Sequence, residues 1–509
     1  MSNNSKTIQS ALISVYHKDN LEPIVRRLDA LGVKIYSTGG TLKFINDLGV
    51  NAIAVESTIG FPEILDGRVK TLHPAIFGGI LARRDNANDM DQLSKHGIGT
   101  LDLVIVDLYP FEDTIRSTND EAEIIEKIDI GGISLIRATA KNFNDTLIVS
   151  DRNQYDDLLQ LLQSKNGSTD IADRKLFAAK AFMTSSHYDT AIFNYFNRSA
   201  ELPVHKVSFS ESKTLRYGEN PHQKGTFYGN LNDIFEILNG KELSYNNLVD
   251  VEASLNLVAE FDEPTFAIIK HTNSCGLASR ASLKEAYDAA FACDPTSAFG
   301  GVLACNRTVD ADTANAMNSL FFEVVTAPDF TAEALEILKS KKNRIIIKLK
   351  QQLHNTKQFK SLLNGVLEQD IDWSSEKAAD FKVVTNVQPS ADQLSDLEFA
   401  IKAVKHLKSN GITLVKNKQL IGMGCGQTSR VDALESAIKK AAAFGFDTTG
   451  AVMASEAFFP FPDCVSISGA AGITAIAQPG GSIKDQESID EANKNNQAMV
   501  LTGIRHFKH

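Results

Sequence analysis

The sequence predicts an α/β protein built on mostly parallel sheets. Apolar, partly β-branched segments of strand length alternate with segments of helical spacing through both halves of the chain. Several strand segments run directly into turns of small polar residues that open a helix, and the clearest buried strand, 101–108, ends at Tyr109. Parallel α/β sheets bind ligands at the carboxyl ends of their strands, so these turns are where we expect the chemistry.

The length of 509 residues exceeds the roughly 250–300 residues of a single core and predicts two or three domains. In the first domain we expect strands at 8–15, 34–36, 101–108 and 146–149, and helices at 21–31, 133–142 and 174–196. A segment of proline, serine and charges follows, so the domains are predicted at 1–199 and 200–509. In the second domain we expect strands at 266–270, 302–305, 344–349 and 414–422, with a possible subdomain break near 376–395.

Composition argues against several classes of protein. The formal net charge of -11 disfavours broad binding to nucleic acid or to a membrane surface. No apolar run reaches the about 18 residues of a membrane span, and no signal-peptide pattern is present. The five cysteines are odd in number and form no Cys-x-x-Cys pair, which is typical of free thiols in a reducing compartment. These features predict a cytoplasmic protein.

The common metal and cofactor motifs are missing from the sequence. The glycines after the 414–422 segment do not form a dinucleotide fingerprint, because Gln427 stands where the third glycine is required. A Walker-type phosphate loop, an H-E-x-x-H pattern and the signature of zinc deaminases are all absent. The sequence therefore predicts no metal site and no tightly bound cofactor.

Lys270 and His271 form the most informative pair in the chain. An apolar strand segment delivers them side by side into a turn of small polar residues. A histidine moves protons near neutral pH, and a neighbouring lysine stabilises developing negative charge. The alternative is a surface lysine beside a hydrogen-bonded loop histidine, and this segment alone does not decide between the two.

In the first domain, two kinds of segment suit a phosphorylated small molecule. Arg68 and Lys70 alternate, so an extended backbone places them on one face beside the Thr71 hydroxyl. Small residues also stand at two expected helix starts, where backbone N–H groups bind anions, namely Ser37, Thr38, Gly39, Gly131 and Gly132. The alternative for the basic loop is a pair of exposed cations.

In the second domain, loops bring together further candidate contacts. Arg216 suits a phosphate and Tyr217 a stacked base, although a polar interdomain loop explains both equally well. Phe299 lies in a small-residue turn, where it flanks a planar ligand or fills the core. Arg430 adds a cation after a flexible turn, and Phe461 is either a core residue or a cover for a heterocycle.

Ten motifs occur in a fixed order over nearly the whole chain: GRVKTLHP, LYPF, IDIGG, RATAKN, LRYGENPHQ, KHTNSCG, SAFGG, GCGQTSR, SEAFFPF and IRHF. Together they resemble the family of bifunctional purine biosynthesis enzymes that join an IMP cyclohydrolase domain to an AICAR transformylase domain. The resemblance implies a methylglyoxal synthase-like, Rossmann-like first domain and a second domain of two cytidine deaminase-like subdomains without zinc. It also implies a homodimer with shared transformylase sites.

The resemblance implies two reactions and assigns residues to each. AICAR takes a formyl group from the co-substrate 10-formyltetrahydrofolate, with His271 as base, Lys270 at the formyl group and Asn410 orienting both. Arg216 and Arg505 match nucleotide-binding residues, and Glu323 matches an acid near the folate. Formyl-AICAR then loses water and closes to IMP, a step that the family assigns to Lys70, Tyr109, Asp129 and Lys141. Lys18, Arg68 and Thr71 are expected near the phosphate of that nucleotide.

One spacing and three departures from the family sequence bear on this family assignment. If 133–141 is one unbroken helix, Lys141 lies roughly 12–15 Å along its axis from Asp129. The sequence also departs from the family at 14–20, at Ser274, where proline is usual, and at Pro462, where arginine is usual. A nucleotide-binding sensor without turnover is the alternative from another class, and an enzyme with only one of the two activities is intermediate.

Overall fold

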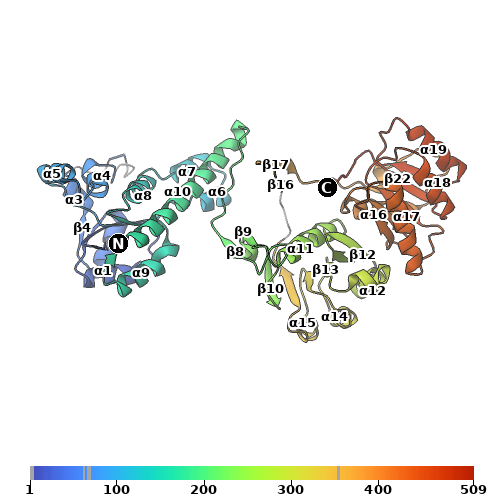
Figure 1. The fold of residues 1–509 in the computed structure, drawn as a ribbon, viewed down its shortest axis with the longest axis horizontal. Coiled ribbons are helices and arrows are strands. Elements are labelled where there is room, and N and C mark those ends of the chain that lie inside the picture. Colours follow the sequence, from blue (N-terminus) through green and yellow to red (C-terminus); the bar gives the residue numbers. More distant parts are fainter. Residues whose placement is uncertain (1–4, 61–63, 66–69, 352–355) are drawn as a thin grey trace. The chain divides into compact units, whose positions relative to one another are not determined.

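The computed structural model describes residues 5–60, 64–65, 70–351 and 356–509. It divides into two compact units, Met1–Ser210 and Glu211–His509 (Figure 1). The boundary predicted at 199/200 falls at the end of helix α10 (Ile171–Ala200), whereas the two units meet between Ser210 and Glu211. The ten residues of 201–210, which follow this helix, belong to the first unit.

The first unit contains a five-stranded, all-parallel sheet in the order β4-β3-β2-β5-β6. Its strands are β2 (Ser10–Ser14), β3 (Lys34–Ser37), β4 (Ala52–Ala54), β5 (Leu103–Val106) and β6 (Leu147–Val149). A small antiparallel pair joins β1 (Lys6–Thr7) to β7 (Ser168–Thr169). β5 is buried along its whole length, as expected for a strand covered by helices on both faces.

The chain order of the strands reverses at β2. From β2 the chain adds β3 and β4 on one side, and it later adds β5 and β6 on the other. Right-handed crossovers therefore place α1 and α8 on opposite faces of the sheet. The helices are α1 (Glu22–Ala30), α2 (Gly39–Asp47), α3 (Val55–Ile59), α4 (Pro74–Leu81), α5 (Ala87–Lys95), α6 (Phe111–Ser117), α7 (Glu121–Glu126), α8 (Gly131–Lys141), α9 (Tyr155–Ser164) and α10.

The second unit contains two six-stranded mixed sheets with the same topology. The first has the order β10-β15-β14-β13-β11-β12, and the second has the order β18-β23-β22-β21-β19-β20. In each sheet three parallel strands are flanked by antiparallel ones, and the last two strands form a hairpin. The resemblance led us to expect two subdomains in this half of the chain, and the two sheets confirm them.

The elements of the first sheet are β10 (Phe235–Asn239), β11 (Thr265–Lys270), β12 (Asn273–Ser279), β13 (Val302–Cys305), β14 (Val324–Ala327), β15 (Ile345–Leu349), α11 (Tyr245–Val258), α12 (Leu283–Cys293), α13 (Pro295–Ala298), α14 (Ala311–Asn318) and α15 (Ala332–Lys339). Those of the second are β18 (Lys382–Val383), β19 (Ile412–Val415), β20 (Leu420–Gly424), β21 (Val452–Ser455), β22 (Ala475–Gln478), β23 (Ala498–Leu501), α16 (Ala391–Lys405), α17 (Arg430–Ala443), α18 (Asp463–Ala470) and α19 (Asp485–Lys494).

One core joins the two sheets of this unit. Buried residues of α11 and α16 belong to the same apolar cluster as residues of both sheets, and the rings of Phe261 and Phe399 lie 5.0 Å apart. The edges also meet, because Ala278 of β12 bridges to Gln419 beside β20. The two hairpins, β11–β12 and β19–β20, are therefore held next to each other.

The prediction of one strand at 414–422 was wrong. This segment forms the end of β19, a turn and the start of β20. The turn residues Asn417 and Lys418 have positive φ values of 54° and 51°, as in a tight hairpin. The polar run 416–419 interrupts the apolar pattern and supplies the asparagine that tolerates this conformation.

Two short strands, β8 (Ser212–Thr214) and β9 (Thr226–Tyr228), open the second unit, and a hairpin of β16 (Lys357–Leu362) and β17 (Gly365–Asp370) extends from it. Every residue of β16 and β17 is exposed.

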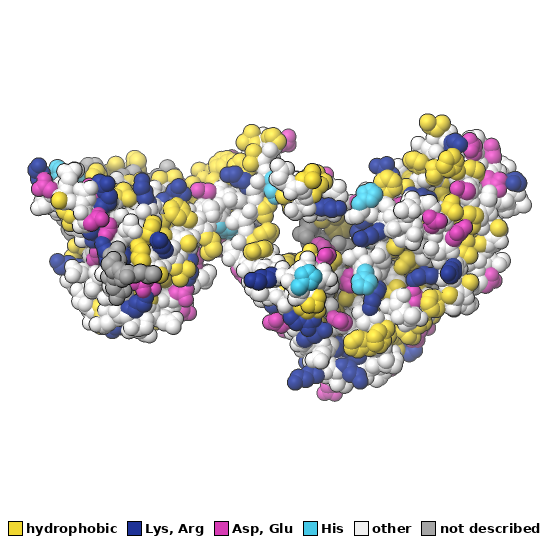
Figure 2. Space-filling model, in the orientation of Figure 1, with side chains coloured by type: hydrophobic (Ala, Val, Ile, Leu, Met, Phe, Trp, Pro, Cys, Tyr) yellow, Lys and Arg dark blue, Asp and Glu magenta, His cyan; other side chains and the backbone are white. Residues whose placement is uncertain are grey.

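On the face seen in Figure 2, acidic and basic side chains are interspersed over both units. No helix among the described residues is both long and apolar enough to cross a membrane.

Candidate functional site

A cavity of about 610 Å³ lies at the carboxyl ends of the strands in the first unit. Segments after β2, β3 and β5 line it, and so do the starts of α2 and α8. It therefore lies where the strand order reverses, the usual binding place in an open parallel sheet. The predicted residues that line it are Lys18, Thr38, Gly39, Lys70, Thr71, Tyr109, Asp129, Gly131 and Gly132.

Lys70 lies beside the turn that opens α2. A Cβ atom on Gly39, whose φ is +49°, would stand 3.5 Å from the Lys70 Nζ. A Cβ atom on Gly131 would stand 3.5 Å from the Thr71 hydroxyl at the start of α8. Two helix N-termini, an ammonium and a hydroxyl thus converge on the same cavity, which suits an anionic ligand.

Asp129 is a buried carboxylate at the start of α8. Its Oδ1 accepts the Gly132 N–H at 2.6 Å. Burial raises the pKa of the Asp129 carboxyl, although hydrogen bonds from backbone N–H groups act in the opposite direction. Burial, followed by the Asp129 charge, also raises the pKa of Tyr109. A carboxyl with a raised pKa beside a tyrosine and a lysine is a suitable proton donor and acceptor.

The loop after β2 is fixed by Asp107, which sequence reasoning missed. Its carboxylate accepts the backbone N–H of His17 at 2.9 Å and bonds the His17 ring at 2.9 Å. Lys18 Nζ donates to the carbonyls of Val15 and Tyr16 at 2.7 and 2.8 Å. Burial lowers the pKa of Lys18, and Asp107 acts in the opposite direction. The only sequence signal for Asp107 was its place at the end of a buried strand.

Two predicted residues of the first unit are not brought to this cavity. The Ser37 hydroxyl is buried and donates to the Ile13 carbonyl at 2.7 Å, so it ties β3 to β2. Lys141 is exposed at the last turn of α8, which is an unbroken helix of 11 residues. The separation anticipated from the helical rise therefore holds. Arg68 lies outside the described residues.

Lys270 and His271 lie at the turn of the β11–β12 hairpin in the second unit. Lys270 Nζ donates to the Phe299 carbonyl at 2.7 Å. The turn residues His271 and Thr272 have φ values of 51° and 65°. A two-residue turn with both central residues at positive φ reverses the chain tightly and leaves His271 exposed.

Asn273 connects this turn with the loop that carries Asn410. The Asn273 side chain donates to the His271 carbonyl at 2.9 Å. Its Oδ1 accepts the backbone N–H of Lys408 at 3.4 Å and faces the Cys425 thiol at 3.2 Å. The structure thus brings Lys270, His271 and Asn410 into one region, although they come from different sheets.

The structure gives Arg430 a different environment from the one we expected of a substrate-binding cation. Its side chain is 7% exposed and forms an ion pair with Glu456, whose side chain is fully buried. The guanidinium also donates to Asn410 Oδ1 at 3.1 Å. An arginine satisfied in this way holds protein groups in place, and its head group is not presented to solvent.

Phe299 and Glu323 lie on the Lys270 side of this region, since the Phe299 carbonyl accepts from Lys270 and the Glu323 N–H donates to the Gly301 carbonyl. Glu323 accepts from Asn247 at 3.1 Å and pairs with Lys241 at 3.3 Å. Burial acts to raise the Glu323 pKa, but these contacts and the Arg216 charge leave it lowered. Phe299 is 62% exposed and packs against Phe321, with ring centroids 5.0 Å apart.

Arg216 and Tyr217 form a local pair, since the Arg216 guanidinium donates to the Tyr217 hydroxyl at 2.7 Å. Arg505 is exposed in the final segment of the chain. Ser409 N donates to the Lys508 carbonyl at 3.0 Å, so this segment runs beside the Asn410 loop. Phe461 is 52% exposed, and Lys484 Nζ lies 4.5 Å from its ring centroid.

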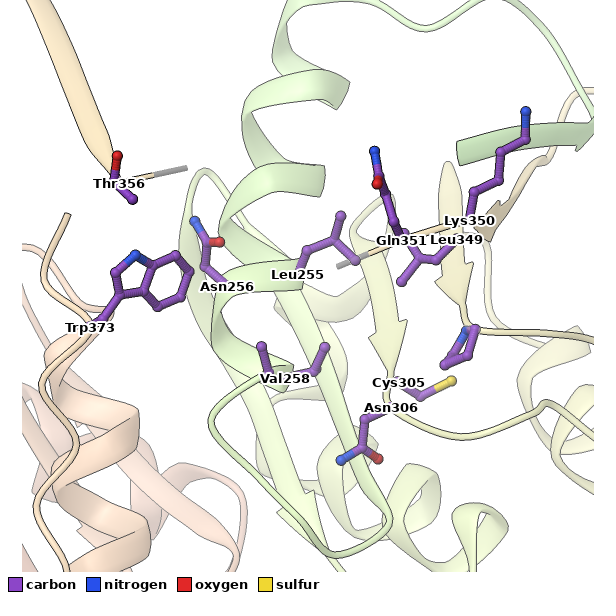
Figure 3. A pocket seen from close by; sticks show the side chains of 12 residues that line it. Leu255, Asn256, Val258, Cys305, Asn306, Leu349, Lys350, Gln351, Thr356 and Trp373 are labelled. Atoms are coloured by element: carbon purple, nitrogen blue, oxygen red, sulfur yellow. The ribbon is translucent and has the colours of Figure 1, made fainter. Parts of the chain in front are cut away.

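A second cavity, of about 690 Å³, lies beside α11 and is shown in Figure 3. It is lined mainly by apolar side chains, including Leu255, Val258 and Leu349, with Trp373 at one side. None of the predicted site residues lines it. Burial raises the pKa of its Cys305 thiol to about 12, so this thiol is not a reactive thiolate.

Among the described residues, no group of three or more histidine, cysteine, aspartate or glutamate side chains is placed to hold a metal ion. The fold and the two sites define a two-unit α/β protein with an anion-binding pocket in one unit and a lysine–histidine pair in the other.

A family model described as AICARFT/IMPCHase bienzyme matches residues 139–440, and one described as MGS-like domain matches residues 20–134. The bifunctional purine biosynthesis protein PurH of Bacteroides thetaiotaomicron is 55% identical over 505 residues, covering 99% of both chains. The proteins of the same name from Acetivibrio thermocellus and Aquifex aeolicus are 47% and 46% identical. They cover 99% and 98% of this chain and 100% of their own lengths.

The chain belongs to the AICARFT/IMPCHase bienzyme family. It is a bifunctional enzyme with AICAR transformylase and IMP cyclohydrolase activities. Formyl transfer from 10-formyltetrahydrofolate to AICAR gives formyl-AICAR, and loss of water closes this intermediate to IMP in the last step of purine synthesis. The expected family and the methylglyoxal synthase-like first domain are thereby confirmed.

Proposed function

We propose that the two reactions run at the two sites described above, one in each unit. Ring closure belongs to the cavity of the first unit, and formyl transfer belongs to the region of Lys270, His271 and Asn410. The observation that carries this assignment is the Asn273 side chain, which ties the His271 turn to the Asn410 loop. A base and an amide from separate sheets are thereby held toward one substrate.

In formyl transfer the attacking AICAR amine is a weak nucleophile, so a base must take its proton. The AICAR amine attacks the formyl carbon and gives its proton to His271, while the formyl oxygen becomes negative. Lys270 and Asn410 stabilise that oxygen, and Lys270 protonates the folate nitrogen as its bond to carbon breaks. Arg216, Tyr217 and Arg505 hold the nucleotide, whereas Phe299, Glu323 and Phe461 lie toward the folate.

Ring closure needs a proton to be removed from one atom and delivered to another. The carboxamide nitrogen attacks the formyl carbon, and the formyl oxygen finally leaves as water. Asp129 is placed for these proton transfers, since burial raises the pKa of its carboxyl, and Tyr109, whose pKa is raised too, stays protonated beside it as a hydrogen-bond donor. Lys70 stabilises the oxygen, and Lys18, Thr71 and the helix starts at Gly39 and Gly131 hold the phosphate.

The experiment supplies each substrate separately to the purified enzyme and to two variants. With AICAR and 10-formyltetrahydrofolate the enzyme forms IMP, and with formyl-AICAR alone it also forms IMP. His271→Ala abolishes formyl transfer and retains closure of supplied formyl-AICAR. Lys70→Ala has the converse effect and accumulates formyl-AICAR. Loss of both activities in either variant contradicts the assignment of separate sites.

The protein is further proposed to be a cytoplasmic homodimer that shares its transformylase sites and uses folate as a co-substrate without a tightly bound cofactor. The exposed β16–β17 hairpin supports association, because an isolated two-stranded hairpin is marginally stable in water. Mixing inactive His271→Ala and Arg216→Ala proteins tests the sharing, because His271 and Asn410 are held together within one chain. Formyl transfer returns in the mixture if a site takes His271 and Arg216 from different chains, and it stays absent if each chain holds a complete site.

A further inference from the structure

A buried ion pair stands directly behind Asn410. Arg430 is the first residue of α17, and Glu456 follows β21. Arg430 Nη2 donates to Glu456 Oε1 at 3.1 Å, and Nη1 contacts the other carboxylate oxygen and the Ser455 hydroxyl, the latter at 2.9 Å. Burying two opposite charges costs desolvation free energy, which their ion pair and further hydrogen bonds offset here.

The pair holds three atoms of the Asn410–Gly411 segment. Arg430 Nη2 donates to the Asn410 side-chain oxygen at 3.1 Å, and Nη1 donates to the Gly411 carbonyl at 3.3 Å. The Glu456 carboxylate accepts the Gly411 N–H at 3.0 Å. Side chain and backbone are thus fixed from one side by the same two charges.

These contacts determine how the Asn410 amide is turned. A guanidinium has only donors, so the amide oxygen must face Arg430 and the amide nitrogen must point away from it. One amide N–H donates to the Gln427 carbonyl at 2.9 Å. The second N–H remains available to a ligand, and Asn410 is half-buried, so that a ligand can reach it.

We infer that Arg430 and Glu456 are positioning residues for formyl transfer, acting through the Asn410 amide. The guanidinium orients the amide and draws electron density from its oxygen, which strengthens the free N–H as a donor. That N–H then stabilises the negative formyl oxygen of the tetrahedral intermediate. This inference rests on the role proposed above for Asn410.

The alternative is that the pair only stabilises the fold. The start of α17 does not depend on the guanidinium, because Ser429 caps the helix by accepting the Asp432 N–H at 3.1 Å. The Glu456 carbonyl also accepts the His506 N–H at 3.0 Å, a backbone contact that side-chain substitution leaves in place. Conservative variants of Arg430 therefore separate the two roles.

The chain offers a matched control. Arg344 is another buried arginine, and its Nη1 donates to the Asn318 amide oxygen at 2.9 Å. It lies in the first sheet of the same unit, before β15, outside the proposed machinery. Arg344→Lys measures what it costs to shorten a buried arginine that holds an asparagine amide.

Arg430→Lys is expected to lower kcat for formyl transfer about 100-fold, the loss typical of one misplaced oxyanion donor, with KM values changed less than about twofold. Arg344→Lys, with a comparable loss of thermal stability, keeps kcat within about twofold of the unsubstituted enzyme. In the Asn410→Ala background, Arg430→Lys adds little, because the two residues act as one unit. Equal kcat losses for both lysine variants, or full additivity with Asn410→Ala, overturn the inference.

Asn410→Asp removes the donor while it keeps an acceptor for the guanidinium. The aspartate keeps an oxygen toward Arg430 but has no N–H to donate, so formyl transfer falls as far as in Asn410→Ala. Retained activity in this variant overturns the inference. If Asn410→Ala leaves formyl transfer intact, the proposed role of Asn410 fails together with this inference. If Asn410→Ala loses formyl transfer but Arg430→Lys keeps normal activity, only this inference is contradicted.

Discussion

The carboxylate of Asp250 accepts the backbone N–H of Thr272 at 2.7 Å, inside the turn that carries His271. Asp250 is the sixth residue of α11. The second sheet repeats the arrangement, since Asp396, the sixth residue of α16, accepts the N–H groups of Asn417 and Lys418 at 2.8 and 2.7 Å. Each aspartate supports a two-residue turn whose residues have positive φ.

Asp250→Ala is expected to impair formyl transfer without affecting ring closure. Left-handed conformations of residues such as His271 and Thr272 cost about 1–3 kcal/mol each and persist only where surrounding contacts enforce them. Without the carboxylate the turn relaxes and the His271 ring is no longer held in its orientation, so kcat falls about 10–100-fold. Steady-state kinetics with AICAR and the folate co-substrate measure this loss.

Asp396→Ala is the matched control for this prediction. It removes the same kind of carboxylate from the same place in the repeated fold, from beneath a turn that carries neither proposed catalytic residue. Burial raises the pKa of both aspartates. Both variants should lose similar stability, and equal losses of formyl transfer would show that Asp250 acts only through the fold.

Gly132→Ala is expected to abolish most ring closure. A Cβ atom at this position would lie 2.7 Å from Asp129 Oδ2 and 3.0 Å from Oδ1, so the carboxylate must move. The Gly132 N–H also holds that carboxylate at 2.6 Å. A shift of about 1 Å in a proton-transfer group costs about 100-fold in rate. The measurement is the rate of IMP formation from supplied formyl-AICAR.

The neighbouring Gly131 provides the comparison. A Cβ atom there meets only the Thr71 hydroxyl at 3.5 Å, an ordinary contact distance. Alanine is also the better helix former at both positions, so helix propensity favours both variants alike. Gly131→Ala should therefore lose several-fold less activity than Gly132→Ala, and the reverse order would remove Asp129 from the proposed mechanism.

Local patterns in the sequence account for most of what was predicted correctly. The buried strand β5, the small-residue turn at Gly39 and the start of α8 are each contained in a few consecutive residues. Their convergence on one cavity follows from the rule that parallel strands present their carboxyl ends at one edge. The separation of Lys141 from the start of α8 likewise follows from the rise of an unbroken helix, whereas its assignment to ring closure stays a prediction.

The contacts that organise the second site lie beyond such local patterns. Asp250 and Thr272, or Arg430 and Glu456, are brought together by sheet pairing and helix packing between distant segments. The two helices do share a short pattern, since Leu248-x-Asp250-x-Glu252 is matched by Leu394-x-Asp396-x-Glu398, but the turns that the aspartates support lie about 20 residues further along the chain. Arg430 looked like a free cation for the same reason, since its carboxylate partner follows a different strand.

A final prediction concerns His506, which follows Arg505 and anchors the end of the chain. Its buried ring bonds Asp372 through Nδ1 at 2.6 Å and Glu376 through Nε2 at 2.9 Å. Only a protonated imidazole donates from both nitrogens. Burial acts to lower the His506 pKa, but the bonds to Glu376 and Asp372 outweigh it and leave the pKa raised above 6.5.

The direction in which His506 changes the free energy of unfolding with pH follows from its proton binding in the folded and unfolded states. A raised pKa means that the folded protein binds more protons than the unfolded chain, so the contribution of His506 is fully present below pH 6.5 and is lost as the pH rises through the folded pKa. His506→Gln should cost about 2 kcal/mol at low pH and less above that pKa. Trp373, the single tryptophan, lies next to Asp372 and reports unfolding by fluorescence.

The contribution of His406 to stability should change with pH in the opposite direction. Burial lowers the pKa of His406, so its contribution is lost as the pH falls, and His406→Gln should matter most above pH 6.5. The two variants should therefore tilt the curve of unfolding free energy against pH in opposite directions. Parallel curves for the enzyme and His506→Gln would mean that His506 does not titrate between its two carboxylates.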